Sequence, residues 1–145
     1  MIDSFRGPYR FLSNFTNCKV WYEDEIDGRW YKTTEHAYQA AKSLDKEMRK
    51  KIQEAATPGD AKRLGNKITL RSNWDKLKLE VMESVCRQKF FLNSAYRKKL
   101  LATGNEELVE GNTWGDKFWG KVGNTGQNWL GRILMKIRKE LQGGN

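Results

Sequence analysis

The final helix expected from the sequence, over residues 128–141, places the strongest constraint on the fold. Its apolar residues recur at offsets of 0, 3, 4, 7 and 11, so they share one side of a helix and face a core. These residues are Leu130, Ile133, Leu134, Ile137 and Leu141. A second long helix is predicted from Trp74 to about Phe91, capped by Ser72 or Asn73. Its expected inward row consists of Leu77, Val81 and Val85, with Met82 and Cys86 beside them.

Shorter elements account for most of the remaining chain. The stretches "KVWY" (19–22) and "RWYK" (29–32) flank a turn that contains Asp-Gly, which indicates a β-hairpin. Thr33 or Thr34 is expected to cap the next helix, which runs to about Leu44. Three further helices are predicted at about residues 45–56, 57–65 and 94–104. The expected fold is therefore mainly α: a single compact helical domain over residues 1–145, with a small N-terminal β-hairpin.

The chain is basic, with 27 Lys and Arg against 18 Asp and Glu, a net charge of +9 and a pI of about 9.6. An anionic ligand suits this charge, although many domains carry a similar surplus on solvated helices. No stretch approaches the roughly 20 apolar residues of a membrane span. The N-terminus lacks the apolar region of a signal peptide. We therefore expect a cytoplasmic protein without a membrane partner, and a monomer.

Several common types of site are excluded by the sequence. The chain has one histidine and two cysteines without C-x-x-C spacing, so we expect no metal site. Neither a Walker A loop nor a G-x-G-x-x-G after a strand is present, and we expect no cofactor.

The stretch "TTEHAYQAAK" (33–42) is the strongest candidate for chemistry. On a helix, Glu35, Tyr38, Gln39 and Lys42 share one face, because their offsets are 0, 3, 4 and 7. The opposite side is small and apolar and consists of Ala37, Ala40, Ala41 and Leu44. The polar face is either a plain solvated surface or a set of groups that bind and act on a sugar. His36 is expected to form hydrogen bonds within the fold.

A loop over residues 110–128 is rich in glycine and has no periodicity, which is typical of a functional loop. Its Trp114 and Trp119 are candidates to stack on a base or a sugar ring. Gly115 lets backbone N–H groups approach a phosphate. Asn128 is expected to cap the final helix first and to contact a ligand second.

Five short motifs follow one another along the chain: "FLSNF" (11–15), "TTEHAYQAAK" (33–42), "NW" (73–74), "GNTWGDKFWG" (111–120) and "NWLGRILMKIR" (128–138). Their order is the one seen in the NADAR (NAD- and ADP-ribose-associated) family, which includes the YbiA-like N-glycosidases. The chain resembles this family over nearly its whole length. The resemblance implies a mainly helical domain that hydrolyses N-glycosidic bonds to ribose. Its substrates are implied to be riboflavin-pathway intermediates or ADP-ribosylated guanine in nucleic acid.

The resemblance also implies roles for individual residues. The essential glutamate and tryptophan of the family fall on Glu35 and Trp74, and its lysine falls on Lys42. Its serine and asparagine fall on Ser13 and Asn14, followed by Phe15. The expected substrate-binding set consists of Ser13, Asn14, Phe15, Tyr38, Gln39, Trp114, Gly115, Asp116, Trp119 and Asn128.

One position departs from the family pattern. YbiA-like members carry an aspartate three residues before the W-G tryptophan, and this chain has Gly111 there. The candidates to replace that aspartate are Asn112, Glu110 and Asp116, and we take Asn112 as the fourth catalytic residue beside Glu35, Lys42 and Trp74.

These expectations describe a metal-free N-glycosidase that acts on a ribosyl or ADP-ribosyl conjugate. The missing aspartate and the net charge favour an ADP-ribosyl conjugate over a riboflavin intermediate. The alternative is a non-catalytic module that binds NAD, ADP-ribose or modified nucleic acid, because both functions need the same pocket.

Overall fold

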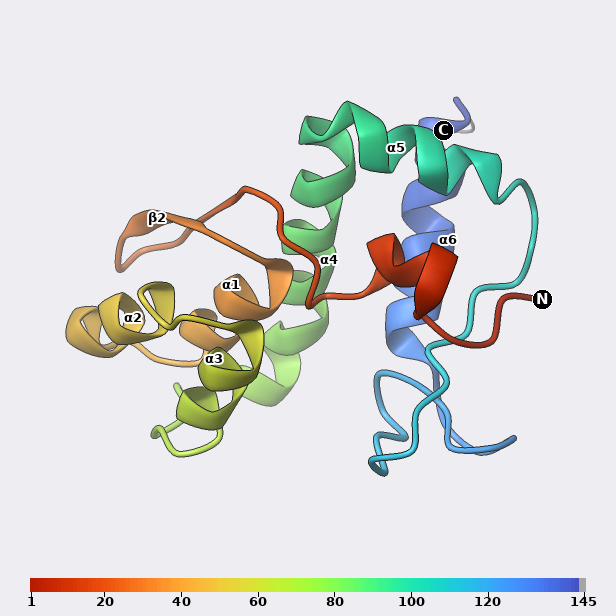
Figure 1. Cartoon of the computed structure of the whole chain (residues 1–145). Coiled ribbons are helices and arrows are strands. Elements are labelled where there is room, and N and C mark those ends of the chain that lie inside the picture. The colour runs from red at the N-terminus through yellow and green to blue at the C-terminus, as the bar shows by residue number, and fades with distance from the viewer. Residues whose placement is uncertain (144–145) are drawn as a thin grey trace. The chain divides into compact units, whose positions relative to one another are not determined.

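The computed structural model describes residues 1–143, and the fold is mainly α with one small two-stranded antiparallel sheet, as the sequence predicts. The contacts of the chain divide it into two compact units. The central unit comprises residues 14–92 and runs from orange to green in Figure 1. The terminal unit combines residues 1–13 with the chain from Asn93 onward. That residues 1–145 form a single domain stays a prediction.

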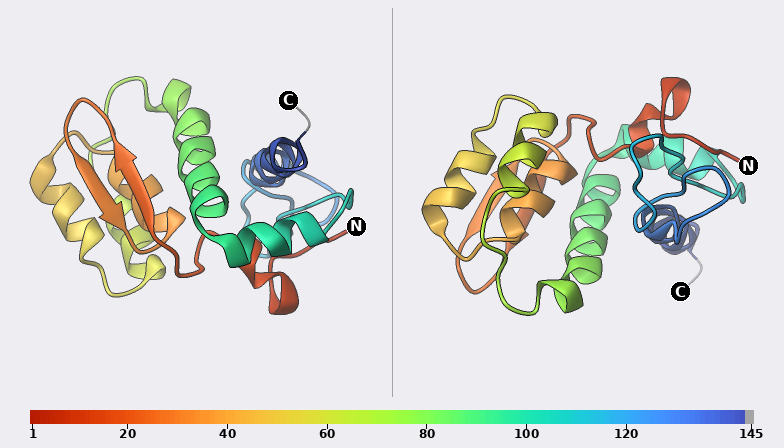
Figure 2. Two further views of the ribbon diagram at one scale, coloured as in Figure 1. Left: turned by 90° about the horizontal axis from the view of Figure 1, so that it is seen from above. Right: turned by 90° about the horizontal axis from the view of Figure 1, so that it is seen from below.

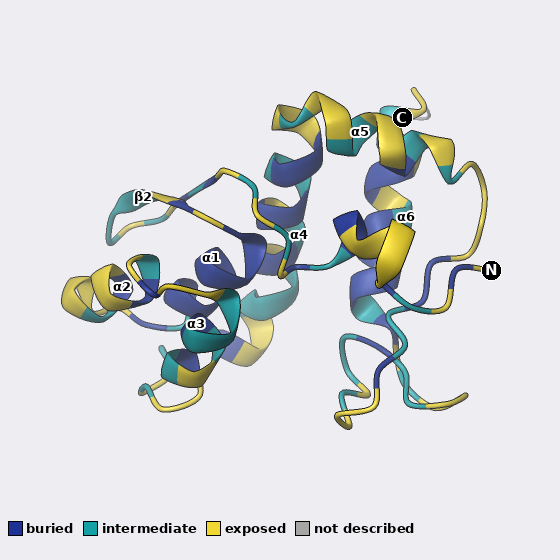
Figure 3. Ribbon diagram, in the orientation of Figure 1, coloured by how far each residue is buried: buried dark blue, intermediate teal, exposed yellow. Residues whose placement is uncertain are grey.

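The central unit is built around a short buried helix. Strands β1 (Val20–Glu23) and β2 (Gly28–Tyr31) form the hairpin, with Val20 opposite Tyr31 and Glu23 opposite Gly28. They are followed by α1 (Thr34–Ala41), α2 (Lys46–Gln53), α3 (Pro58–Gly65) and α4 (Trp74–Leu92). Seen from above, the hairpin lies in front of α1, and seen from below, α3 lies in front (Figure 2). Every residue of α1 is consequently buried (Figure 3).

The ends of α1 show why its register is well defined. The hydroxyl of Thr33 accepts a hydrogen bond from the His36 N–H at 3.0 Å, so Thr33 is the N-cap. The helix ends at Ala41, three residues before the predicted end at Leu44. Leu44 is therefore 47% exposed and does not belong to the buried apolar side, which corrects that prediction.

The longest helix, α4, supplies the wall against which α1 and β1 pack. Its buried residues include the predicted Val81, Met82, Val85 and Cys86, whereas Leu77 is only half-buried. Asn73, which precedes the helix, has a left-handed backbone (φ +69°), a conformation that asparagine adopts more readily than most residues.

The terminal unit contains a 3₁₀ helix (Gly7–Leu12), α5 (Ser94–Ala102) and α6 (Trp129–Leu141). Four of the five residues in the predicted apolar stripe of α6 are buried, and the fifth, Leu141, is half-buried near the helix end. The N-terminal segment pairs with the loop before α6, since Ile2 exchanges hydrogen bonds of 2.8 Å with Glu107 and Val109. Over residues 1–143, no helix is long and apolar enough to cross a membrane.

Candidate active site

Glu35 lies in the first turn of α1 and is only 7% exposed. Its backbone N–H donates a hydrogen bond to the carbonyl of Asn14 at 3.2 Å, which satisfies one of the four donors that a helix leaves open at its start. The positive end of the helix dipole lies at this turn and favours a charged carboxylate. The fold thus places a buried acid in the first turn of α1, at the positive end of the helix dipole.

Gln39 holds the carboxylate of Glu35 in place. Its side-chain nitrogen donates to Oε2 of Glu35 at 2.6 Å, one helical turn away. The other end of the amide, Oε1, is buried and has no hydrogen-bond partner within the described chain. It lies so close to Gly65 that a Cβ on that residue would be 1.8 Å from it. Gly65, predicted only as a helix stop, therefore leaves room for the Gln39 side chain.

The same face of α1 carries an aromatic pair and an amine. The rings of Tyr38 and Trp74 have centroids 5.3 Å apart, and both side chains are buried. The Nζ atom of Lys42 lies over the Tyr38 ring, 5.6 Å from its centroid. A plain solvated surface is thereby excluded, because only Lys42 of the four polar residues on this face is half-buried rather than buried.

The protonation of Lys42 responds to its surroundings. Burial lowers the pKa of the Lys42 ammonium below its ordinary value of 10.5; the charge of Glu35 opposes this shift, and the charges of Lys62 and Lys78 add to it. Lys42 and Glu35 therefore interact electrostatically across two turns of the helix. An amine whose pKa is lowered is more often neutral, and a neutral amine is a nucleophile.

Lys62 and Lys78, whose charges act on Lys42, are not among the residues predicted from the sequence. Lys78 follows Trp74 by four residues on α4 and so projects from the same face of that helix. Its helical spacing from Trp74 could therefore have predicted Lys78 from the sequence. No sequence pattern could have predicted Lys62, because Lys62 comes near Lys42 only through the packing of α3 against α1.

Asn14 and Phe15 are site residues that the resemblance to the family implies, and their surroundings differ. The Oδ1 atom of Asn14 accepts a hydrogen bond from the Thr34 hydroxyl at 2.8 Å and one from the Cys86 thiol at 3.7 Å. Its Nδ2 atom donates to the sulfur of Met82 at 3.4 Å. Asn14 thus joins the start of α1 to α4 and positions Glu35, while Phe15 is 38% exposed.

His36 has the structural role that was expected. Its Nδ1 atom lies 2.8 Å from the Thr33 hydroxyl, and its Nε2 atom lies 3.0 Å from the carbonyl oxygen of Ala55. The ring is fully buried, and burial lowers the pKa of His36.

The remaining candidates belong to the terminal unit. Ser13 is half-buried there, and its N–H donates to the Arg10 carbonyl.

In the loop before α6, Asn112 uses both ends of its amide. Its Nδ2 atom donates to Oε2 of Glu110 at 2.8 Å and to the carbonyl of Asp116 at 2.9 Å, and its Oδ1 atom accepts from the Asp116 N–H at 3.0 Å. Asn112 therefore links the other two candidates to replace the family aspartate, Glu110 and Asp116.

The position of that aspartate has a physical reason to be a glycine in this chain. A Cβ at Gly111 would lie 2.1 Å from the backbone oxygen of Asp3, which no side chain can tolerate. The N-terminal strand-like segment therefore occupies the space that a side chain would need.

Asp116 and Trp119 complete the loop. The Asp116 carboxylate accepts hydrogen bonds from the Phe118 N–H at 3.1 Å and the Trp119 N–H at 2.9 Å. The half-buried ring of Trp119 packs edge-on against Phe118, with centroids 4.8 Å apart. Trp114 is 57% exposed, and the neighbouring Gly115 has φ +88°, which favours glycine.

Asn128 occupies the N-cap position of α6, as predicted, but its side chain does not cap the helix. Asn128 has a left-handed backbone (φ +54°) and makes no side-chain hydrogen bond to the helix. Its amide turns back instead, accepting from the Glu110 N–H and donating to the Leu108 carbonyl, both at 2.9 Å. Asn128 therefore fixes the segment that leads into the loop.

The predicted residues thus form two groups. Glu35, Tyr38, Gln39, Lys42 and Trp74 lie together in the central unit, and Asn112, Asp116, Trp119 and Asn128 shape one loop of the terminal unit. Within residues 1–143, no cluster of three or more His, Cys, Asp or Glu side chains has an arrangement that could hold a metal ion.

Comparison with known proteins extends over almost the whole chain. The NADAR domain family model matches residues 3–142. N-glycosidase YbiA of Escherichia coli (strain K12) is 38% identical over 131 residues, which cover 88% of this chain and 81% of that protein. The NMR structure of the E. coli protein YbiA has 36% identity and a TM-score of 0.80, and covers 98% of this chain and 87% of its own. Riboflavin biosynthesis protein VVA0006 of Vibrio vulnificus (strain YJ016) is 38% identical over 135 residues, which are 91% of this chain but only 35% of that protein.

Proposed function

Because the chain belongs to the NADAR domain family and is an N-glycosidase of that family, we propose that it cleaves the bond between C1 of a ribose and an exocyclic amine, with Glu35 and Lys42 at the reacting sugar. The single observation that carries this proposal is the buried pair of Glu35 and Gln39 beside Lys42 and the Tyr38–Trp74 rings. The enzyme class sets aside the alternative of a module that only binds.

Glu35 is suited to stabilise positive charge. As the C1–N bond breaks, C1 acquires oxocarbenium-like character, and an adjacent carboxylate lowers the energy of that state. The hydrogen bond from Gln39 fixes one oxygen of Glu35, so the carboxylate is oriented before the substrate arrives. Trp74 and Tyr38 supply an aromatic wall for the sugar or the base.

Lys42 has two candidate roles. A ribose attached to an exocyclic amine can open its ring to an imine at C1. The neutral Lys42 amine then adds to C1, the base departs as its free amine, and a Schiff base joins C1 to Lys42. Water hydrolyses that Schiff base and releases the sugar aldehyde and the lysine. In the second role, Lys42 stays protonated and binds a phosphate together with Lys62 and Lys78.

The proposed substrate is an ADP-ribosyl conjugate, either ADP-ribosyl-guanosine or ADP-ribosylated guanine in nucleic acid. Gly111 in place of the family aspartate and the net charge of +9 support this choice over a singly phosphorylated riboside. The name of the relative VVA0006 favours a second candidate, an aminopyrimidine riboside of the riboflavin pathway. The monomeric state and the cytoplasmic location stay predictions.

A substrate panel tests the proposal. Purified protein is incubated with ADP-ribosyl-guanosine, with an oligonucleotide carrying the same group, and with a monophosphate aminopyrimidine riboside, and mass spectrometry follows the free base. We expect the highest kcat/KM for an ADP-ribosyl substrate. A preference for the aminopyrimidine riboside would overturn the substrate choice, and release of base from none of them would overturn the reaction.

A further inference from the structure

Arg71 lies in the coil between α3 and α4, yet its side chain is only 7% exposed. Its backbone connects two residues of the proposed site. The Arg71 N–H donates to the carbonyl of Lys42 at 2.8 Å, and the Arg71 carbonyl accepts from the Trp74 N–H at 3.3 Å. One residue therefore bridges the end of α1 to the start of α4.

Two arginines donate to carbonyl groups at the C-terminal end of α1 and just beyond it. The Arg71 guanidinium donates to the carbonyl of Ala41 at 3.3 Å, and Nε of Arg49 donates to that of Ser43 at 2.8 Å. With the Arg71 N–H on Lys42, the three consecutive carbonyls of residues 41–43 each have a donor. Positive charge at this end also suits the helix dipole. The backbone of Lys42 is thus held on both sides.

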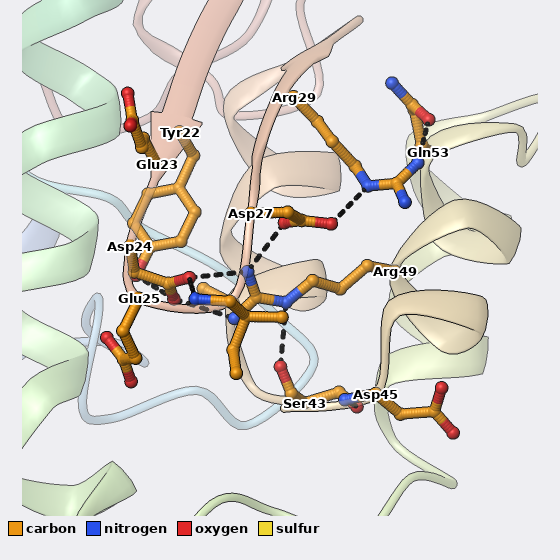
Figure 4. Close-up of polar contacts among 12 residues, drawn as sticks. Tyr22, Glu23, Asp24, Glu25, Asp27, Arg29, Ser43, Asp45, Arg49 and Gln53 are labelled. Carbon is orange, nitrogen blue, oxygen red and sulfur yellow. Dashed lines mark hydrogen bonds and ion pairs between the residues drawn. The ribbon is translucent and has the colours of Figure 1, made fainter.

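Asp24, in the hairpin turn, anchors both arginines. Its carboxylate accepts from Arg49 at 2.8 and 2.7 Å and from Arg71 at 2.9 Å. Figure 4 shows Arg49 reaching from α2 toward Asp24, Asp27 and Ser43. Burial raises the pKa of Asp24, but the hydrogen bonds from Arg49, the Ile26 N–H and Arg71 outweigh it and hold that pKa well below its usual range.

The two arginines have different surroundings. Arg49 is fully buried, pairs with both Asp24 and Asp27 and donates to the Ser43 carbonyl, so its loss would remove the central ion pair of this cluster and leave Asp24 with Arg71 and Asp27 with Arg29. Arg71 contacts Asp24 and also Glu25, whose side chain is 65% exposed. If Arg71 is removed, Asp24 keeps its two bonds from Arg49, and the fold keeps its buried ion pair. The Arg71 side chain is therefore placed to order the site without being required for folding.

We infer that Arg71 is a positioning residue for the N-glycosidase reaction: anchored by Asp24, it sets Lys42 and Trp74 in the geometry that the sugar requires. This inference rests on the proposed function of Lys42 and Trp74. Arg71 touches no reacting atom, because its guanidinium is occupied by carboxylates and the Ala41 carbonyl.

The test compares Arg71→Met and Arg71→Lys with a matched control, Arg63→Met. Arg63 also pairs with a carboxylate, that of Asp60, but its side chain is 69% exposed on α3. We expect Arg71→Met to lower kcat about 10- to 100-fold, because small misplacements of reacting groups have effects of this size. KM should stay within about twofold, since the binding groups are retained. Arg71→Lys should recover part of kcat, and Arg63→Met should match the wild type.

A second readout does not depend on catalysis. The rate at which an amine-acylating reagent modifies Lys42 is measured by mass spectrometry in the same four proteins. We expect faster modification of Lys42 in Arg71→Met, because the end of α1 is released, and no change in Arg63→Met. If Arg71→Met fails to fold, the kinetics of Arg71→Lys test the positioning role alone. A lower kcat at an unchanged KM then supports it.

The outcomes separate the two claims. If the wild type cleaves no ribosyl conjugate, the proposed function fails, and the acylation rates still decide whether Arg71 orders Lys42. If Arg71→Met and Arg71→Lys keep wild-type kcat and wild-type acylation of Lys42, the inference is wrong. A lower melting temperature with kcat per folded molecule unchanged would also overturn it, since Arg71 would then be structural only.

Discussion

On α1, the amide of Gln39 donates to another side chain, the carboxylate of Glu35, whereas in the loop of residues 110–128 the amide of Asn112 bonds mainly to backbone groups of its own loop. The difference follows from where each backbone finds its partners. Helical N–H and C=O groups bond to one another, so the side chains of α1 remain available for chemistry. A loop without regular pairing needs side chains to satisfy its backbone.

This comparison changes how polar residues in the two regions are interpreted. Asn112, Asp116 and Asn128 resemble ligands in sequence, but their polar atoms hold the loop in shape. Substitutions on α1 should therefore reduce turnover at nearly constant stability. Substitutions of the loop amides should reduce stability first.

The largest effect is expected at Lys42. If the amine forms a Schiff base with C1, borohydride added during turnover reduces the imine and leaves a ribosyl adduct on Lys42, which peptide mass spectrometry detects. Lys42→Arg should abolish both the adduct and the activity, because guanidinium cannot form the imine. If Lys42→Arg is active and the wild type yields no adduct, the covalent route is wrong and Lys42 acts only as a positive charge that binds phosphate.

The pH dependence of trapping gives the next largest effect. Only the neutral amine reacts, so the trapping rate should rise about tenfold per pH unit at pH values below the pKa of Lys42 and level off above it. Because burial lowers this pKa, the plateau should begin below pH 10.5. A rate that is still rising at pH 10.5 would contradict a lowered pKa.

For the loop, Asn112→Ala removes both ends of a buried amide and leaves the backbone of Asp116 without its partners. We expect the free energy of unfolding, measured with urea, to fall by about 1–3 kcal/mol. The exposed Asn105→Ala is the control and should change it by less than about 0.5 kcal/mol. Lost turnover at wild-type stability would instead make Asn112 catalytic, as its place in the sequence suggested.

The smallest effect is expected at Trp114. Its side chain is 57% exposed, so Trp114→Ala should hardly change the free energy of unfolding. If the ring stacks on the base, KM should rise about fivefold or more, since such stacking contributes at least about 1 kcal/mol. An unchanged KM for ADP-ribosyl-guanosine would remove Trp114 from the substrate-binding set.

Local rules predicted the elements well, because capping and periodicity depend on neighbouring residues. Thr33 caps α1, and the stripe of α6 is buried as expected. The failures depend on contacts between distant segments. The Asn128 side chain bonds to Leu108 and Glu110 rather than to the start of its helix, and Gly65 is needed by Gln39 on another helix.

The candidate site was predictable only in part for the same reason. The spacing of Glu35, Tyr38, Gln39 and Lys42 places them on one face, but it does not distinguish a solvated face from a buried one. Burial comes from the hairpin and from α3, which the spacing does not include. Likewise, nothing local to Arg71 indicates that it joins Lys42 to Trp74.

The most direct test of the account is the turnover of Glu35→Gln. This substitution keeps the shape of the side chain and a partner for the Gln39 amide while it removes the negative charge. We predict that kcat for the preferred ribosyl substrate falls at least about 100-fold, because the charge that stabilises the cationic sugar is lost. The melting temperature should stay within a few degrees of the wild type. A kcat within fivefold of the wild type would remove Glu35 from the mechanism.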